Sequence, residues 1–370
     1  MNLLFLIVIP TVTPTNGKQI LFTTMGRFQS NVMDIVAIDP TNGNVTKLYQ
    51  LPPLSSLDGF DVCMKIDSKR NLIHILISAV LSSDAVIGSA SYIYELSLSD
   101  GHLITTFNLS NNFGVGEGFT LWDYDPDTST LYGLCLNQSS ALYWNYTWCY
   151  AEFDEYGLGK TEHGFFVSDD DDPPGAGFCD RVSMNRNTFV TGEYWYSVGK
   201  DLFVRHVTSP TGEPGEMIWA VEDKKEFDAM QFAALVTGKT NEYAIVIRAP
   251  LIDHERANES TRMTVVKLKP GGNEEIIAEL PENLFTMGPG GVRWDYDPID
   301  EILYLLMQSD PNQVQCDTLV KVNLTQPTNS RSSSSAKIQT IPVSLKLLFD
   351  PQSYSVNEVH LVEWPPITGP

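Results

Sequence analysis

"WDYDPDTSTLY" runs from Trp122 to Tyr132, and "WDYDPIDEILY" runs from Trp294 to Tyr304. The two stretches match without a gap at 7 of 11 positions and begin 172 residues apart. In both, the alternation of aromatic and acidic residues predicts a β-strand with two different faces, and Asp-Pro predicts the turn that ends the strand. The chain therefore repeats a structural unit, and the length of that unit indicates the fold.

Weaker copies of the unit occur along the whole chain. A Gly-Phe pair begins a strand-like segment at Gly59, Gly118 and Gly177, and successive copies are 59 residues apart. Three later copies follow from residue 226 onward. Each unit contains four apolar or alternating segments separated by Gly, Asn, Asp or Pro, and none shows a sustained helical period. The sequence therefore predicts an all-β chain.

Repeated units of about 40–60 residues with four strands each are typical of β-propellers. The chain ends are predicted to share one blade, because segments within residues 18–52 match second, third and fourth strands, and "SLKLLFDP" (344–351) is expected to supply the first. This joining removes the open edge of a linear array. We predict one domain (17–370): a six-bladed β-propeller with four-stranded antiparallel blades, closed by N- and C-terminal strands. "NEVHLVEW" (357–364) is then surplus, so a seven-bladed propeller stays open as the alternative.

In the motif turn, four residues separate Asp-Pro from Leu-Tyr, and this spacing is the basis of a resemblance to known repeats. It resembles the loosely related repeats of extracellular six- and seven-bladed propellers, of the NHL-like, YVTN-like and quinoprotein-like types. The resemblance covers the architecture of the whole mature chain and implies no particular activity.

The N-terminal segment predicts export. Residues 1–16 contain an apolar run from Leu3 to Ile9 that Pro10 ends, which suits the hydrophobic part of a secretory signal peptide and is too short to span a bilayer. The alternative is a buried strand. We expect a secreted, extracellular glycoprotein without membrane insertion. The candidate glycosylation sites are Asn44, Asn108, Asn137, Asn145, Asn258 and Asn323.

Charge limits the partners. The chain has 46 Asp and Glu against 24 Lys and Arg, a formal net charge of -22. Such a surface repels phosphate backbones and anionic lipids, so we predict no nucleic-acid partner. Cationic partners, Ca²⁺ or a mineral surface suit the charge better. The predicted partner is an extracellular protein, a glycan or a mineral surface.

Cysteine usage predicts one disulfide. The chain has 5 cysteines and no zinc-binding spacing. Cys135 and Cys149 lie on neighbouring strands of a predicted hairpin and form the best candidate pair. The odd number leaves at least one cysteine without an intramolecular partner.

The loops that lead into the first strands, here named the leading loops, are acidic. In a propeller they meet at one end of the channel, where carboxylates repel one another unless a cation lies between them. Ca²⁺ is the candidate ion, and solvated loop carboxylates are the alternative. In outline the chain resembles Ca²⁺-dependent propeller lactonases and esterases, which use a central cation. The candidate ligands are Asp58, Glu117, Asp169, Asp170, Asp171, Asp172, Glu226 and Asp228.

The motif itself supplies two further candidates. Asp123 and Asp295 occupy the same position in the two copies, on the strand face opposite the motif aromatics. We predict that they line the channel, and we favour a structural role over a catalytic one. The main functional prediction is an extracellular binding or matrix protein, with a mineral-associated role as a special case. The alternative is a Ca²⁺-dependent hydrolase of the lactonase or esterase type.

Overall fold

The computed structural model describes a large part of the 370-residue chain. The described residues are 17–26, 33–51, 60–83, 86–108, 118–125, 129–140, 143–154, 157–166, 177–185, 188–195, 199–208, 213–222, 228–234, 244–250, 263–269, 273–285, 293–297, 299–310, 316–324, 338–343 and 354–364. Within these ranges, no helix combines the length and apolar character that a membrane crossing needs.

The described strands form six four-stranded antiparallel sheets. From first to fourth strand, three of them are β24 (Tyr354–Trp364), β1 (Gly17–Gly26), β2 (Met33–Ile38), β3 (Val45–Gln50); β4 (Phe60–Asp67), β5 (Leu72–Ser83), β6 (Val86–Ser97), β7 (Leu103–Asn108); and β8 (Gly118–Asp125), β9 (Thr130–Ser140), β10 (Tyr143–Asp154), β11 (Gly157–Phe166). The others are β12 (Gly177–Asn185), β13 (Thr188–Trp195), β14 (Gly199–Thr208), β15 (Glu213–Glu222); β16 (Asp228–Ala234), β17 (Ala244–Pro250), β18 (Thr264–Lys269), β19 (Asn273–Glu279); and β20 (Arg293–Asp297), β21 (Ile302–Met307), β22 (Thr318–Asn323), β23 (Ile338–Pro342).

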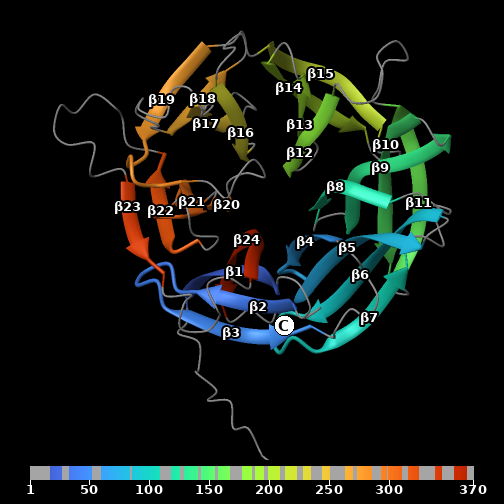
Figure 1. The fold of residues 1–370 in the computed structure, drawn as a ribbon, viewed down its shortest axis with the longest axis horizontal. Coiled ribbons are helices and arrows are strands. Elements are labelled where there is room, and N and C mark those ends of the chain that lie inside the picture. Colours follow the sequence, from blue (N-terminus) through green and yellow to red (C-terminus); the bar gives the residue numbers. More distant parts are fainter. Residues whose placement is uncertain are drawn as a thin grey trace, which may run out of the picture.

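The sheets are arranged around a common centre with their first strands innermost (Figure 1). Each first strand contacts the first strand of the next sheet, in the order β4, β8, β12, β16, β20, β24 and back to β4. The expectation of an all-β chain of antiparallel four-stranded sheets is confirmed. Both copies of the repeated motif contribute first strands, β8 and β20, as predicted.

One strand assignment was wrong. The first strand of the sheet that joins the chain ends is β24, which covers residues 354–364, and not the expected segment 344–351. β24 pairs with β1 from Gly17 opposite Trp364 to Gly26 opposite Tyr354. The strand that is surplus in the six-bladed prediction is therefore the partner of β1.

β24 is suited to this place because it is buried on both faces. Val362 packs with residues of the β4–β7 sheet, and Val359 packs with residues of the β20–β23 sheet. A strand covered on both sides needs apolar residues pointing in both directions. In "NEVHLVEW" the apolar residues do not alternate strictly with the polar ones, as expected of such a strand.

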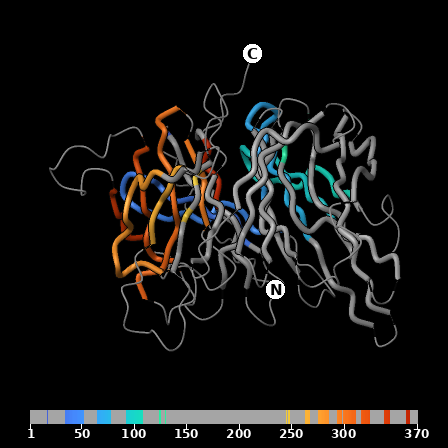
Figure 2. Tube along the Cα trace, turned by 90° about the horizontal axis from the view of Figure 1, so that it is seen from above, coloured from blue at the N-terminus to red at the C-terminus, as the bar shows by residue number. Residues whose placement is uncertain are grey.

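The cores lie between neighbouring sheets and are built by the two-residue period of the strands. In β2, Ile35 and Ala37 pack toward the β4–β7 sheet, whereas Val36 and Ile38 pack toward the β20–β23 sheet. A third core joins the β16–β19 and β20–β23 sheets, and Trp294 packs against it. Turned by 90° from that view, the strands coloured orange lie together on one side of the molecule (Figure 2).

Outer hairpins of two sheets pack on the fourth strand of the preceding sheet. Gly43, between β2 and β3, has a φ of 75°, and an added Cβ would lie 2.0 Å from the carbonyl oxygen of Pro342 in β23. Gly101, between β6 and β7, has a φ of 68°, and an added Cβ would lie 1.9 Å from the ring of Tyr49 in β3. Both positions therefore require glycine for two reasons: the turn needs a positive φ, and the neighbouring strand leaves no room for a Cβ atom.

Candidate functional site

The turn that follows a first strand has the same construction in three sheets. Its last residue has a left-handed backbone in each: Asn71, Ser129 and Glu301, with φ of 59°, 57° and 50°. In two of these turns, the aspartate that begins the turn, Asp67 or Asp297, accepts hydrogen bonds from backbone N–H groups inside it. Asp297 accepts from Ile299 at 3.0 Å, in agreement with the prediction that the motif Asp-Pro sets a turn.

Asp67 begins the equivalent turn after β4 and extends it into a buried cluster. Its carboxylate has no exposed surface and accepts from the Arg70 backbone N–H at 3.0 Å, from Arg70 Nη1 at 2.8 Å and from the Tyr124 hydroxyl at 2.8 Å. Burial and the Asp67 carboxylate raise the pKa of Tyr124 above its usual range. Because Tyr124 belongs to β8, this hydrogen bond joins two neighbouring sheets.

His74 completes the cluster from β5. Strand register places it directly opposite Lys65 on one side and Glu95 on the other. Its ring is 1% exposed, lies 4.7 Å from the Tyr124 ring between centroids, and brings Nδ1 to 3.7 Å from Glu95 Oε2. Burial lowers the pKa of His74 to about 4, so the ring is neutral at physiological pH.

These groups are placed for structure rather than for turnover. A general base must reach the proton that it removes, within about 3 Å or through one water. Asp67 and His74 are enclosed between two sheets, with exposed fractions of 0% and 1%. The cluster therefore links the β4–β7 sheet to the β8–β11 sheet, and its polar row stands beside the apolar core on the other face of β5.

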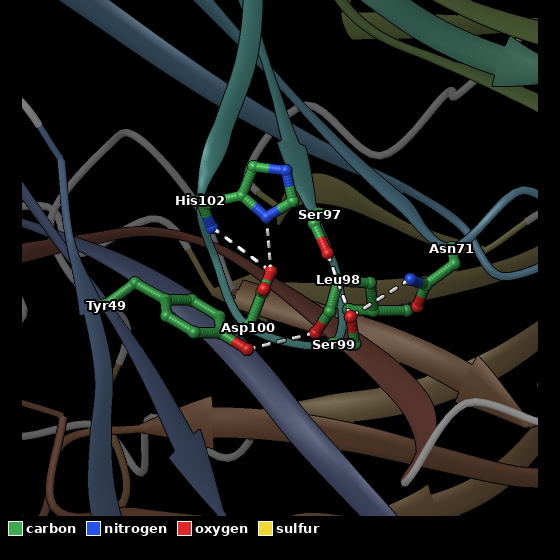
Figure 3. A network of polar contacts seen from close by, with 7 residues as sticks. All are labelled: Tyr49, Asn71, Ser97, Leu98, Ser99, Asp100 and His102. Atoms are coloured by element: carbon green, nitrogen blue, oxygen red, sulfur yellow. Dashed lines mark hydrogen bonds and ion pairs between the residues drawn. The ribbon is translucent and has the colours of Figure 1, made fainter.

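A second, more exposed network lies at the same end of the β4–β7 sheet (Figure 3). Leu98 donates its backbone N–H to the Asn71 carbonyl at 2.8 Å, and the Asn71 side chain donates to Ser99 Oγ at 3.2 Å. The Tyr49 hydroxyl reaches across from β3 and donates to the Leu98 carbonyl at 3.0 Å. The turn after the first strand and the turn between the third and fourth strands therefore share one end of the molecule.

The exposed part of this network holds an aspartate–histidine pair. His102 Nδ1 lies 2.6 Å from Asp100 Oδ1, and both side chains are 63% exposed. Hydrogen bonds from Ser97 and His102 lower the pKa of Asp100. A serine–histidine–aspartate catalytic unit needs the serine on the far nitrogen of the imidazole. Here the Ser97 hydroxyl bonds with Ser99 and Asp100, so the residues form a turn and not a nucleophile with its base.

Asp295 lies on β20 and bonds to the neighbouring first strand. Its carboxylate accepts the backbone N–H of Leu361 in β24, and that of Tyr296 at 2.8 Å. Burial raises the pKa of this carboxyl group, while His360 and Lys65 oppose the rise. Asp123 is placed by register opposite Tyr132, as Asp295 is opposite Tyr304. Channel lining stays a prediction for both.

Most of the predicted metal ligands lie outside the described residues: Asp58, Glu117, Asp169, Asp170, Asp171, Asp172 and Glu226. Asp228 is the first residue of β16, opposite Pro250. In the part of the chain that the structure describes, no three His, Cys, Asp or Glu residues lie together so that they could hold a metal ion.

The cysteine pair and two sequons lie on one hairpin. Cys135 is opposite Thr147, and Cys149 is opposite Gly133, so the two cysteines are on adjacent strands but two positions apart. Their disulfide stays a prediction. Asn137 is directly opposite Asn145 on these strands. Of the other sequons, Asn44 is exposed in a turn, Asn108 ends β7, Asn323 ends β22 and Asn258 lies outside the described residues.

The Asp67 cluster was not predicted, although the sequence held one signal for it. "IDSKRNL" from Ile66 aligns with "YDPDTST" from Tyr124, which places Asp67 at the turn position of the motif. The contact between Asp67 and Tyr124 joins two different repeats, and no spacing within one repeat reveals it.

Comparison with known proteins gives similarities of fold only. No protein-family model and no curated protein sequence matches the chain. The structure is similar to that of a proposed 6-phosphogluconolactonase from Bacteroides fragilis, with 10% identity, a TM-score of 0.39 and coverage of 95% of this chain and 99% of the other. It is also similar to a puromycin hydrolase, with 11% identity and a TM-score of 0.44, and to a puromycin-hydrolyzing peptidase from Mycobacterium tuberculosis, with 11% identity and a TM-score of 0.41. Each of these two alignments covers 87% of this chain, which spans 53% of the other protein's length. At such identities and TM-scores, the similarities carry no functional argument.

Proposed function

We propose that this chain is a secreted binding protein built on a closed six-bladed β-propeller, whose acidic end binds Ca²⁺ and other cationic partners. The observation that carries the proposal is the succession of contacts between first strands, from β4 through β20 to β24 and back to β4. The pairing of β24 with β1 supports closure, because it uses the edge that an open array would leave exposed.

A closed ring would support this function, because it would gather the leading loops at one end. Each sheet is a set of four antiparallel strands, so all first strands begin at one end and their turns lie at the other. The segments before β4, β8, β12 and β16 carry Asp58, Glu117, the run Asp169–Asp172 and Glu226. Carboxylates gathered in this way repel one another, and a cation with six to eight oxygen ligands relieves that repulsion.

Partners follow from charge and compartment. With a net charge of -22, the protein attracts basic protein segments and cation-rich surfaces, including mineral. Glycans are a further class of ligand, which would bind to the Ca²⁺ ion held at the acidic end. Secretion through residues 1–16 belongs to the same proposal, and so does a matrix role outside the cell.

The test is thermal unfolding of the full chain with Ca²⁺ and with EDTA. Ligand that binds only the folded state raises the melting temperature as its concentration exceeds the dissociation constant. We expect a rise with Ca²⁺ that is lost when Asp169, Asp170, Asp171 and Asp172 are all changed to Asn. The matched control neutralises four carboxylates elsewhere: Glu275→Gln, Glu279→Gln, Glu282→Gln and Asp300→Asn.

The control variant should keep the full response to Ca²⁺, because it alters net charge equally but leaves the leading loops intact. If both variants lost the Ca²⁺-induced rise in melting temperature equally, the rise would depend only on the overall charge of the protein. Turnover of lactones or aryl esters, lost in Glu117→Gln or Asp228→Asn, would replace the binding function by the hydrolase alternative. A panel without turnover supports the binding protein.

A further inference from the structure

We infer that Asn44 carries an N-linked glycan, displayed at the end of the molecule opposite the acidic leading loops. The inference rests on the secretion that is part of the proposed function. It concerns a motif that the cation-binding function does not use.

Asn44 lies in a turn between β2 and β3 that its neighbours hold in place. Asp39 Oδ1 accepts from the Thr41 backbone N–H at 2.8 Å, and Asn42 Oδ1 accepts from the Asn44 backbone N–H at 2.8 Å. The Asp39 backbone N–H donates to the Asn44 carbonyl at 2.9 Å. The backbone polar groups of Asn44 are thus engaged within the turn, while the residue itself is exposed.

The whole acceptor sequence is part of this turn and of the strand after it. Asn44, Val45 and Thr46 form the Asn-x-Thr triplet, and all three are described in the structure. Gly43, directly before Asn44, packs against the Pro342 carbonyl of β23 and fixes the turn against the neighbouring sheet. A bulky, polar glycan fits a folded protein only where it can extend into solvent, and this turn meets that condition.

The chemistry is a transfer to the side-chain amide. A bond forms between Asn44 Nδ2 and C1 of the first sugar, while the bond between C1 and the pyrophosphate oxygen of a lipid-linked oligosaccharide donor breaks. The amide loses one proton, which balances the charge of the departing pyrophosphate. The donor is supplied by the secretory compartment, so the step depends on export.

The position of the turn separates the glycan from the acidic end. The hydrogen bond between Asn71 and Ser99 shows that the turn after a first strand and the turn between third and fourth strands share one end. Asn44 lies in the turn between the third and fourth strands of its sheet, and the leading loops enter from the other end. A glycan at Asn44 therefore leaves the acidic end uncovered.

Asn323 shows the contrast within the same protein. It is the last residue of β22, pairs with Ile302 and is only partly exposed. The next residue, Leu324, is 5% exposed and donates its backbone N–H to the Glu301 carbonyl at 2.9 Å. This sequon is tied to the core, so we expect lower occupancy at Asn323 than at Asn44.

To test this, the full chain is expressed in a host that exports it through the secretory pathway, and its glycans are mapped by peptide mass spectrometry. Enzymatic release of the glycan in H₂¹⁸O turns an occupied Asn into ¹⁸O-labelled Asp, which identifies the site. We expect label at Asn44, loss of one glycan from the intact mass in Thr46→Ala, and its return in Thr46→Ser. Thr46→Ala leaves Asn44 in place, so a loss reports the acceptor triplet.

A secreted protein with glycans elsewhere and an unlabelled Asn44 would overturn the inference and leave the proposed function standing. A chain that is retained with no glycan would end the secretion proposal as well. The Ca²⁺-induced rise in melting temperature should be the same with and without the Asn44 glycan. A rise that appears only after glycan removal would show that the glycan covers the acidic end.

Discussion

Asp67 lies at the end of β4 with no exposed surface, and its carboxylate joins Arg70 of its own turn to Tyr124 of the next sheet. A buried carboxylate is costly unless donors surround it. Here those donors come from two sheets, so the carboxylate fixes how the sheets pack. At the residue scale, Asp67 therefore has a structural role, and ligand binding by the leading loops belongs to the proposed function.

The link between Asp67 and Tyr124 is measurable by Tyr124→Phe. The change removes one hydrogen bond to a charged acceptor, so the free energy of unfolding should fall by about 1.5–3 kcal/mol. The matched control is Tyr49→Phe, which removes a hydrogen bond to the Leu98 carbonyl and should cost about 0.5–1.5 kcal/mol. Denaturant unfolding of both variants measures the difference, and equal losses would contradict the role of Asp67.

The buried His74 predicts that the free energy of unfolding decreases as the pH falls into the acid range. Its folded-state pKa of about 4 lies below the ordinary value of 6.5, so the unfolded chain binds the proton more readily between these values. The contribution to stability is complete above pH 6.5 and is lost as the pH falls toward 4, by about 3 kcal/mol in total. The titratable groups around the His74 ring are Lys65, Glu95, Asp67 and Tyr124.

The measurement compares His74→Gln with the unchanged protein by urea unfolding at several pH values. The difference in unfolding free energy between the two proteins should shrink as the pH falls through this window. Glu95, whose pKa burial raises, acts with the opposite sign, so the comparison uses the difference and not the raw curve. Parallel curves from pH 7 to pH 4 would contradict a buried, neutral His74.

The outer hairpins join neighbouring sheets by a shared device. The turn glycines Gly43 and Gly101 each lie against the fourth strand of the sheet before. Tyr49 adds a hydrogen bond to this contact, from β3 to the β6–β7 turn. At the element scale, these neighbouring sheets are therefore joined at their outer strands as well as along their first strands.

Gly101→Ala should be strongly destabilising. The new Cβ meets the Tyr49 ring and must adopt a φ of 68°, which costs about 1–2 kcal/mol before any clash is counted. Gly17→Ala is the matched control, because its φ of 158° is extended and nothing lies within 4 Å of the added atom. Thermal unfolding should separate the two by several degrees, and equal stability would contradict the packing of the hairpin.

Most strands were predictable because their patterns are local, whereas the closing strand β24 is defined by its pairing with a distant segment, β1. Alternation in "WDYDP" and the short apolar run "ILYLLM" both predict strands, so β20 and β21 follow from the sequence alone. Segments 344–351 and 354–364 are both rich in apolar residues, and only pairing with β1 distinguishes them. Contacts between repeats, such as Asp67 with Tyr124, depend on spatial order and have no local signature.

At the scale of the whole molecule, the account depends on closure of the ring. A closed ring would bring the leading loops together and place Asn44 at the opposite end. An open array would leave one edge of β1 unpaired and would separate the acidic loops. Both the proposed cation site and the position of the glycan thus rest on the pairing of β1 with β24.

The most direct test is disulfide cross-linking between these two strands. Lys18 lies directly opposite Glu363, whereas Ser355 pairs with Met25 near the other end of the strands. Directly opposite residues in an antiparallel pair have Cα atoms about 4.5–5.5 Å apart, within the range that a disulfide spans. Peptide mapping after oxidation should find a bond in Lys18→Cys/Glu363→Cys and none in Lys18→Cys/Ser355→Cys. A bond in neither variant, or equal bonding in both, would contradict the closed ring.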